Sequence, residues 1–270
     1  MKKKILKLSL FVIGAYTLLL VLLYIGQEKL IFHPSKTASG YSYPYSNNHE
    51  ELFIKTVDKV NLHGVLFKTD SISKGLIFYL HGNGGTIESW GKVSKIYNKL
   101  GYDVFMLDYR GYGKSTGKII NETQFLSDTQ LAYDGLKKRY KENEISILGY
   151  SIGTGSASYL ASQNKPKRLI LQAPYYSLQE LVSRLMPFVP DFILNYKLNT
   201  AKYLESVNCP INILHGTEDL TIPYESSVLL KKKTPNKVKL FTFTEQGHNE
   251  LHYNTNYLKV ISRILVDPNK

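Results

Sequence analysis

The stretch ILGYSIGTGSA, residues 147–157, decides the fold of this chain. A short aliphatic run leads into the motif GYSIG, and small residues suited to a closely packed helix follow it. The two glycines of the motif leave room where a Cβ atom would collide with neighbouring backbone. A G-x-S-x-G pattern between a strand and a helix is typical of a sharp turn that presents a nucleophilic serine. The sequence therefore predicts that Ser151 is a catalytic nucleophile.

A serine hydroxyl is a weak nucleophile unless a base takes its proton and a carboxylate orients that base. When the nucleophile sits in such a turn, the chain order is serine, then acid, then histidine. Asp219, which follows the predicted strand INILHG, is the predicted acid, and His248, in the loop TEQGHNEL, is the predicted base. The alternatives are His215 at a strand end and His252 in the terminal helix for the base, and Glu218 and Glu245 for the acid.

Attack by a serine on a carbonyl creates a negative oxygen that needs hydrogen-bond donors. One donor is expected to be the backbone N–H of Ile152, the residue after the nucleophile. The second is expected from the loop HGNGG, residues 81–85, where Asn83 is the first choice and Gly82 the alternative. A phosphate cradle is the competing interpretation of this loop, but no Walker lysine follows it and no dinucleotide fingerprint is present. His81 is expected to be structural.

Predicted strands and helices alternate along most of the chain. Apolar runs predict strands at 52–57, 62–67, 76–80, 103–107, 145–148, 168–171, 211–214 and 238–243. Helical patterns lie at 88–100, 122–140, 153–163 and 224–233, and a terminal helix follows. This alternation predicts an α/β fold, with an initial hairpin and a mostly parallel central sheet covered by helices on both faces. Residues 174–208 are too long for an ordinary crossover and are predicted to be a short, lid-like insertion.

The N-terminal segment is predicted to be a transmembrane anchor. Residues 8–25 carry no charge, and a helix of this length nearly spans a hydrocarbon core of about 30 Å. A cleaved signal peptide would have a shorter apolar stretch and small residues at the cleavage site. Four lysines precede the segment, so the N-terminus is expected to be cytoplasmic and the catalytic domain extracytoplasmic. The predicted organisation is an anchor at 1–26, a connector at 27–50 and a catalytic domain at 51–270.

Composition limits the classes of partner and cofactor. The net charge of +12 is spread mostly as separate lysines, without a nucleic-acid-binding motif or a basic and aromatic stripe. Nucleic-acid binding is therefore not expected, although weak attraction to anionic lipid headgroups is an open alternative. The single cysteine, Cys209, excludes an internal disulfide and a cysteine-rich metal site. No metal or organic cofactor is expected, and the sequence indicates no oligomeric state.

Five motifs in order, LHGNGG, DYRGYGKS, GYSIGTG, HGTED and GHNEL, resemble the α/β-hydrolase superfamily from about Leu52 to Asp267. The resemblance is to the serine-hydrolase branch that includes membrane-anchored abhydrolase-domain proteins, monoacylglycerol-lipase-like enzymes and protein depalmitoylases. It implies the α/β-hydrolase fold and a loop beside the active site at 108–113, where Arg110 is expected to be structural. The chain departs from the depalmitoylase pattern because it lacks a cysteine-rich N-terminus, and from larger lipases because its insertion is short.

These observations predict a membrane-anchored serine hydrolase that cleaves a carboxylic ester or thioester through an acyl-enzyme on Ser151. The expected substrate is a small-molecule or lipid-like acyl compound. A serine peptidase or amidase of the same fold is one alternative. A catalytically silent hydrolase fold that serves as a binding protein is the other, although all three residue types of a triad are present in the required order.

Overall fold

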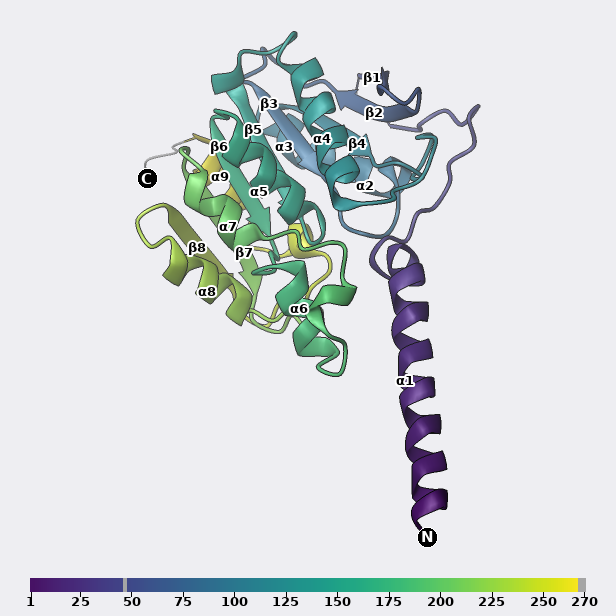
Figure 1. Cartoon of the computed structure of the whole chain (residues 1–270). Helices are drawn as coiled ribbons and strands as arrows, with labels where there is room; N and C mark the ends of the chain where they lie inside the picture. The colour runs from purple at the N-terminus through teal and green to yellow at the C-terminus, as the bar shows by residue number, and fades with distance from the viewer. Residues whose placement is uncertain (46–47, 267–270) are drawn as a thin grey trace.

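The computed structural model describes residues 1–45 and 48–266. Parts of the predicted connector and of the predicted catalytic domain, at 46–47 and 267–270, lie outside the described residues. The centre of the described chain is an eight-stranded sheet with the order β1-β2-β4-β3-β5-β6-β7-β8 (Figure 1). Its strands are β1 His49–Lys55, β2 Asn61–Phe67, β3 Leu76–Leu80, β4 Asp103–Asp108, β5 Ile145–Tyr150, β6 Arg168–Gln172, β7 Ile211–Gly216 and β8 Val238–Phe243.

The sheet is antiparallel at one edge and parallel elsewhere. Strands β1 and β2 form a hairpin, and β2 also pairs with β4 in the antiparallel direction. All other neighbouring strands run parallel, from β4 and β3 through to β8. The predicted α/β fold with a mostly parallel sheet is therefore confirmed. Parallel strands bring their carboxyl ends to one edge of the sheet, which is where such folds hold their functional residues.

Helices cover both faces of the sheet because the strands are apolar on both faces. In β3, Leu76, Phe78 and Leu80 pack into one core, while Ile77 and Tyr79 pack into the other. The first core includes side chains of α4 Glu122–Leu136, α5 Gly153–Gln163, α7 Thr200–Ser206 and α8 Glu225–Lys233. The second includes side chains of α2 Ile87–Trp90, α3 Ser94–Lys99 and α9 Tyr257–Val266.

Three helix predictions need correction. The helix predicted at 122–140 is α4 and ends at Leu136. The helix predicted at 88–100 is divided into α2, a 3₁₀ turn at Gly91–Val93 and α3. Gly91 packs against the ring of Tyr45 so closely that a Cβ there would overlap it, and the interruption lies at this contact. His252, which we placed in the terminal helix, lies in a separate 3₁₀ turn at Leu251–Tyr253. That turn follows Glu250, whose left-handed backbone does not continue a helix.

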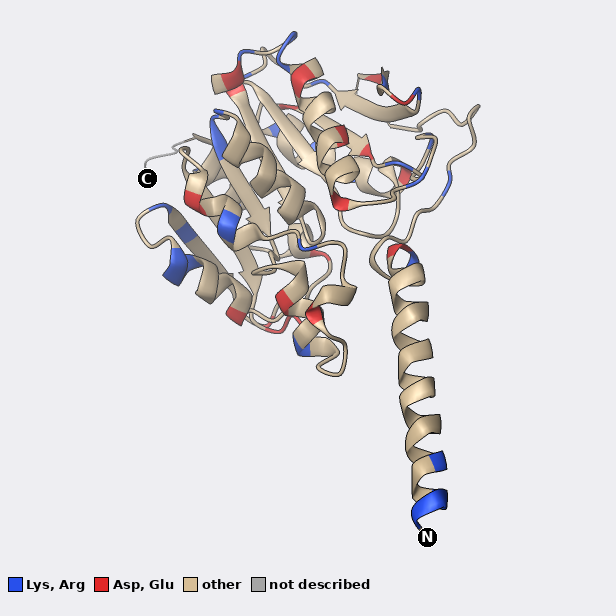
Figure 2. Cartoon of the chain, in the orientation of Figure 1, with Lys and Arg blue, Asp and Glu red and all other residues tan. Residues whose placement is uncertain are grey.

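Helix α1 spans Lys2–Ile31 and projects from the domain as a long shaft (Figure 1). It is long and apolar enough to cross a membrane, and charge appears only near its two ends (Figure 2). The helix extends past residue 26, so the beginning of the segment assigned to the connector is helical. No proline or glycine breaks the helix between Gln27 and Ile31, and the first proline, Pro34, comes just after its end.

The predicted insertion at 174–208 consists of short helices. It contains α6 Leu178–Leu185, a 3₁₀ turn at Asp191–Ile193 and α7. Ser177 caps α6 by accepting a hydrogen bond from the N–H of Glu180 at 3.0 Å. Helix α7 packs on α5, whereas α6 and the loop after it reach toward α1. The insertion therefore lies between the sheet and the N-terminal helix.

Candidate active site

Ser151 lies in the turn between β5 and α5 with a left-handed backbone, at φ 52°. This conformation is unfavourable for a residue with a side chain, and the surrounding backbone holds it. The Ser151 N–H donates to the carbonyl of Gln172 at 2.9 Å. A Cβ at Gly153 would overlap the backbone oxygen of Leu80, and one at Gly149 would lie 2.5 Å from the oxygen of Gly153. Both glycines are thus required by close backbone approach.

The structure brings the three predicted triad residues together from three separate loops. The Oγ atom of Ser151 lies 3.0 Å from Nε2 of His248. The Nδ1 atom of the same ring lies 2.7 Å from Oδ2 of Asp219. An ionised carboxylate only accepts hydrogen bonds, so Nδ1 carries the proton and Nε2 is left to accept from the serine hydroxyl. This arrangement suits proton removal from Ser151.

Asp219 is buried and is surrounded by donors. Its Oδ1 accepts from the N–H groups of Thr221 at 2.9 Å and Ile222 at 2.8 Å. Burial acts to raise the pKa of Asp219, but hydrogen bonds from His215, His248 and Ile222 outweigh it and hold the pKa below its usual range. Asp219 is therefore a carboxylate at any physiological pH.

The two rival acids stay away from the histidine. Glu218 and Glu245 are both exposed, and neither is among the partners of His248 in the described residues. His215 and His252 do not contact Ser151 either. The hydroxyl of Tyr150 donates to the backbone carbonyl of His248, which fixes the loop that carries the ring.

His215 has a supporting place that sequence reasoning did not predict. Its Nε2 lies 3.1 Å from Oδ2 of Asp219 and 3.0 Å from the carbonyl of Ile222, so this nitrogen carries the proton. Its Nδ1 lies 2.6 Å from the hydroxyl of Ser227. The ring is fully buried. His215 lies at the end of β7, four residues before Asp219, and this position was the signal in the sequence that could have predicted the contact.

The predicted oxyanion donors lie beside the nucleophile. Ile152 and Asn83 line the same cavity as Ser151, whereas Gly82 does not. In the described part of the chain, neither the Ile152 nor the Asn83 backbone N–H donates a hydrogen bond. Both N–H groups are thus free to bind a substrate oxygen. The backbone carbonyl of Asn83 accepts a hydrogen bond from the hydroxyl of Tyr112 at 2.8 Å, which fixes this part of the loop.

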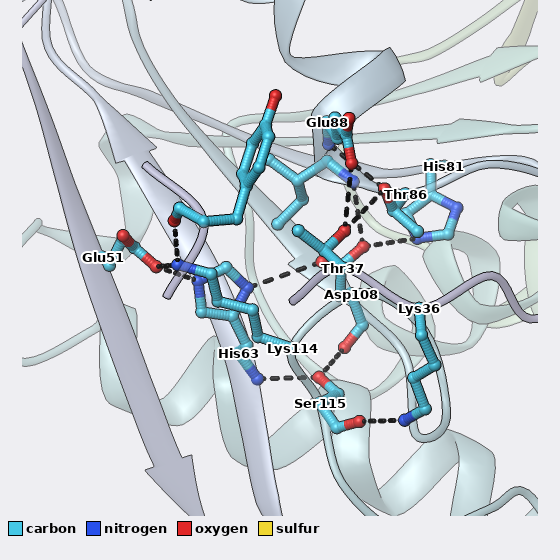
Figure 3. Close-up of polar contacts among 12 residues, drawn as sticks. Lys36, Thr37, Glu51, His63, His81, Thr86, Glu88, Asp108, Lys114 and Ser115 are labelled. Carbon is cyan, nitrogen blue, oxygen red and sulfur yellow. Dashed lines mark hydrogen bonds and ion pairs between the residues drawn. The ribbon is translucent and has the colours of Figure 1, made fainter. Parts of the chain in front are cut away.

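Buried polar contacts hold the loop that contains Asn83 (Figure 3). Oδ1 of Asp108 accepts from the N–H of Ile87 at 2.9 Å and lies 3.7 Å from Nε2 of His81. Nδ1 of His81 donates to the carbonyl of Gly82 at 2.7 Å. Burial, opposed by the nearby Asp108, lowers the pKa of His81, so its ring is neutral. His81 therefore takes the structural position that the sequence indicated.

Arg110 also has a structural position. Its guanidinium donates to both carboxylate oxygens of Asp58 and to Asp128, and its side chain is buried. Bidentate pairs of this kind fix loops firmly. They leave Arg110 at the base of the loop at 108–113, and it does not line the cavity at Ser151.

A cavity of about 330 Å³ opens at Ser151 and is almost entirely apolar. One wall comes from the insertion, through Leu178, Leu181, Val182, Leu185, Met186, Val189, Ile193 and Leu194. The opposite wall comes from α1, through Leu23, Gln27, Leu30 and Ile31. Sequence reasoning did not predict that the anchor lines this cavity. The polar Gln27, just after the apolar segment, was the one signal for it.

Metal-binding groups of three or more His, Cys, Asp or Glu side chains are absent from the residues at 1–45 and 48–266. The site around Ser151 brings together a candidate nucleophile, a candidate base, a candidate acid, two backbone N–H groups and an apolar cavity. This constellation is suited to acyl transfer.

The chain is similar in sequence to known hydrolases. Residues 71–203 match the family described as "Serine aminopeptidase, S33". Lysophosphatidylserine lipase ABHD12 of Danio rerio is 31% identical over 179 residues, which cover 58% of this chain and 47% of the relative. The protein of the same name in Macaca fascicularis is 31% identical over 174 residues, covering 57% and 44%. The chain thus spans about half the length of these relatives.

Solved esterase structures have the same architecture. An esterase of Pyrococcus furiosus superposes with a TM-score of 0.71 at 20% identity, covering 87% of this chain and 97% of the esterase. Est1E from Butyrivibrio proteoclasticus gives a TM-score of 0.63 at 20% identity, covering 80% and 95%. At this level of identity, the likeness shows a shared fold.

Proposed function

From the hydrolase family match, the lipase relatives and the shared α/β-hydrolase fold, we propose that the chain is a membrane-anchored serine hydrolase of the α/β-hydrolase superfamily that cleaves a carboxylic ester. The single observation that carries the proposal is the hydrogen-bonded chain from Ser151 Oγ through His248 to Asp219, with distances of 3.0 Å and 2.7 Å. A nucleophile, a base and an orienting acid in contact are the working parts of an acyl-transfer enzyme.

In the proposed reaction, Ser151 Oγ attacks the carbonyl carbon of the ester while its proton moves to Nε2 of His248. The carbonyl oxygen becomes negative and binds the N–H groups of Ile152 and Asn83. His248 then gives the proton to the departing alkoxide, which leaves as an alcohol, and the acyl group stays on Ser151. Water attacks this acyl-enzyme by the same steps in reverse, so that the carboxylic acid and free Ser151 result.

Asp219 acts on the ring and does not itself take the proton. Its carboxylate keeps the Nδ1 proton of His248 in place and stabilises the imidazolium that forms during attack. His215 and two backbone N–H groups hold the carboxylate in turn. We therefore assign His215 as a positioning residue.

The proposed substrate is a lipid-like acyl ester. The apolar cavity at Ser151 favours an acyl chain, and the similar proteins named above include lipases that act on lysophosphatidylserine. A thioester fits the same machinery. Amide hydrolysis is the second candidate, on the ground of the serine aminopeptidase family description. An apolar cavity lined by leucine and valine gives few partners to the polar backbone of a peptide, so the ester is preferred.

The proposed location is a membrane crossed once by α1. Four lysines at positions 2, 3, 4 and 7 precede the apolar segment, and positive charge next to such a segment favours the cytoplasmic side. The catalytic domain is then extracytoplasmic. Protease added to intact cells should degrade the domain, whereas an opposite orientation would protect it.

The test is reaction of the full chain with a fluorophosphonate probe, together with hydrolysis of a short aryl ester. The wild-type protein should be labelled and should hydrolyse the ester. Ser151→Ala should lose both, and its turnover should fall by about 10⁴-fold or more. Ser226→Ala is the matched control, because Ser226 is buried in α8 and is outside the triad. A folded wild-type protein that takes no label would support a binding function instead.

A further inference from the structure

Helix α1 contacts the catalytic domain along one stripe of its surface. Most of its side chains are exposed, and the residues that are buried or half-buried are Leu20, Leu23, Gly26, Gln27, Glu28 and Ile31. Spacings of three and four residues place most of these on one face of a helix. Leu30, between Gln27 and Ile31 in the sequence, also lines the cavity at Ser151, together with Leu23 and Gln27.

Polar contacts fix this stripe against the insertion. Oε1 of Gln27 accepts from the N–H of Asn195 at 2.7 Å, and its Nε2 donates to the carbonyl of Ile193 at 3.2 Å. Further along the helix, the hydroxyl of Tyr16 donates to the carbonyl of Phe188 at 2.7 Å. The insertion is thus held at two levels of α1, so that the cavity between them has two fixed walls.

The lower contact lies deep along the apolar segment. Tyr16 is eleven residues from Gln27, which is about 16 Å along a helix. It also stands near the middle of the uncharged run at 8–25. If that run spans the bilayer, Phe188 lies well below the headgroups of the leaflet next to the domain.

The tip of the insertion has the surface that this depth requires. Leu185, Phe188 and Phe192 are exposed, at 59%, 53% and 78% of their areas. Exposed apolar side chains grouped in this way mark a surface that contacts lipid or a partner. Among the nearby charges, Arg184 pairs with Glu180 at 2.6 Å, and the carboxylate of Asp191 accepts a hydrogen bond from the hydroxyl of Ser183 at 2.6 Å. Continuity with α1 identifies the partner as the bilayer that α1 crosses.

We propose that α1 is one wall of the acyl-binding pocket, and that this pocket opens sideways into the leaflet beside the domain. The inference rests on the proposed ester hydrolase function and adds the substrate class, an ester whose long acyl chain already lies in the membrane. The acyl chain of the substrate enters between Leu23 and the insertion, and the ester carbonyl reaches Ser151. Residues of α1 then determine which acyl-chain lengths the pocket accepts.

The test compares two tryptophan substitutions on α1 in the full chain, in mixed micelles. Leu23→Trp adds bulk to the pocket wall, whereas Leu22→Trp adds the same bulk at a neighbouring position that is 60% exposed. Aryl esters from acetate to palmitate are the substrates. For Leu23→Trp we expect kcat/KM with palmitate to fall by about tenfold or more, as when two methylenes are kept out of an apolar pocket. Acetate hydrolysis by Leu23→Trp should fall far less than palmitate hydrolysis, and all rates of Leu22→Trp should stay unchanged.

Leu23→Ala provides a second variant that adds no bulk. Because it enlarges the pocket, the acyl length with the highest kcat/KM should be longer than in the wild-type protein. Equal losses on acetate and palmitate, or equal effects of Leu22→Trp and Leu23→Trp, would overturn the inference. A wild-type protein that hydrolyses neither ester refutes the proposed function itself, which separates the two failures.

Discussion

At the scale of single residues, the side chain of Asp219 has more hydrogen-bond partners than the side chain of Ser151 or of His248. Its two oxygens meet two histidine rings and two backbone N–H groups. The same contacts orient His248 and hold the pKa of Asp219 below its usual range, despite burial. The proposed catalysis and the stability of the fold should therefore both depend on this carboxylate, and the stability should depend on pH through it.

We expect the folded state to lose the stabilising contribution of Asp219 as the solution becomes acidic. A carboxyl whose pKa is lower in the folded state than in the unfolded state stabilises the fold above its unfolded pKa of about 3.9. This stabilisation is lost as pH falls through the lower, folded pKa. Urea unfolding between about pH 5 and pH 2.5 should show a smaller decline for Asp219→Asn than for wild type. The exposed neighbour variant Glu218→Gln should follow the wild-type decline, and a wild-type slope in Asp219→Asn would contradict the assignment.

At the scale of elements, the turn from β5 to α5 depends on how closely two chain segments approach. The start of α5 lies against the end of β3, and only a residue without Cβ fits at Gly153. The approach places the Ile152 N–H at the start of a helix, beside the loop that supplies Asn83. We therefore expect this packing contact at Gly153 to hold the backbone conformation of Ser151 and the separation between the N–H groups of Ile152 and Asn83.

Gly153→Ala should destabilise the protein by about 1–3 kcal/mol, because the added methyl group forces β3 and α5 apart. Gly84→Ala is the matched control, since an added Cβ there meets no atom within 4 Å. Thermal unfolding followed by circular dichroism measures the difference. A Gly153→Ala protein that melts at the temperature of the Gly84→Ala protein would show that the close approach is unnecessary.

At the scale of the whole molecule, the membrane helix and the catalytic domain share a cavity but have different tasks. The proposed triad and both proposed oxyanion donors lie in the domain after residue 50, whereas α1 supplies one apolar wall of the cavity. The esterases of similar fold cover 80–87% of this chain. We therefore expect the proposed reaction centre to work without α1, and the proposed acyl pocket to need it.

Deleting residues 1–26 should release the protein from membranes and preserve hydrolysis of short aryl esters. The same deletion removes Leu23 from the pocket, so the preference for long acyl chains should be lost. Sedimentation with membranes and the acetate-to-palmitate rate ratio are the two measurements, with the full chain in detergent as the reference. A folded truncation that no longer hydrolyses the short ester would place α1 within the reaction centre.

The sequence by itself determined the fold class and proposed the triad. Hydrophobic runs have local periods, and the motifs around Ser151, Asp219 and His248 each carry their own turn chemistry, so both are legible without long-range contacts. Only the tertiary structure decided that Glu218 is exposed while Asp219 meets His248, that His215 contacts Asp219, and that Leu23 and Gln27 of α1 line the cavity at Ser151. These facts depend on where separate segments meet in space, and an apolar helix has the same sequence pattern whether lipid or a pocket covers it.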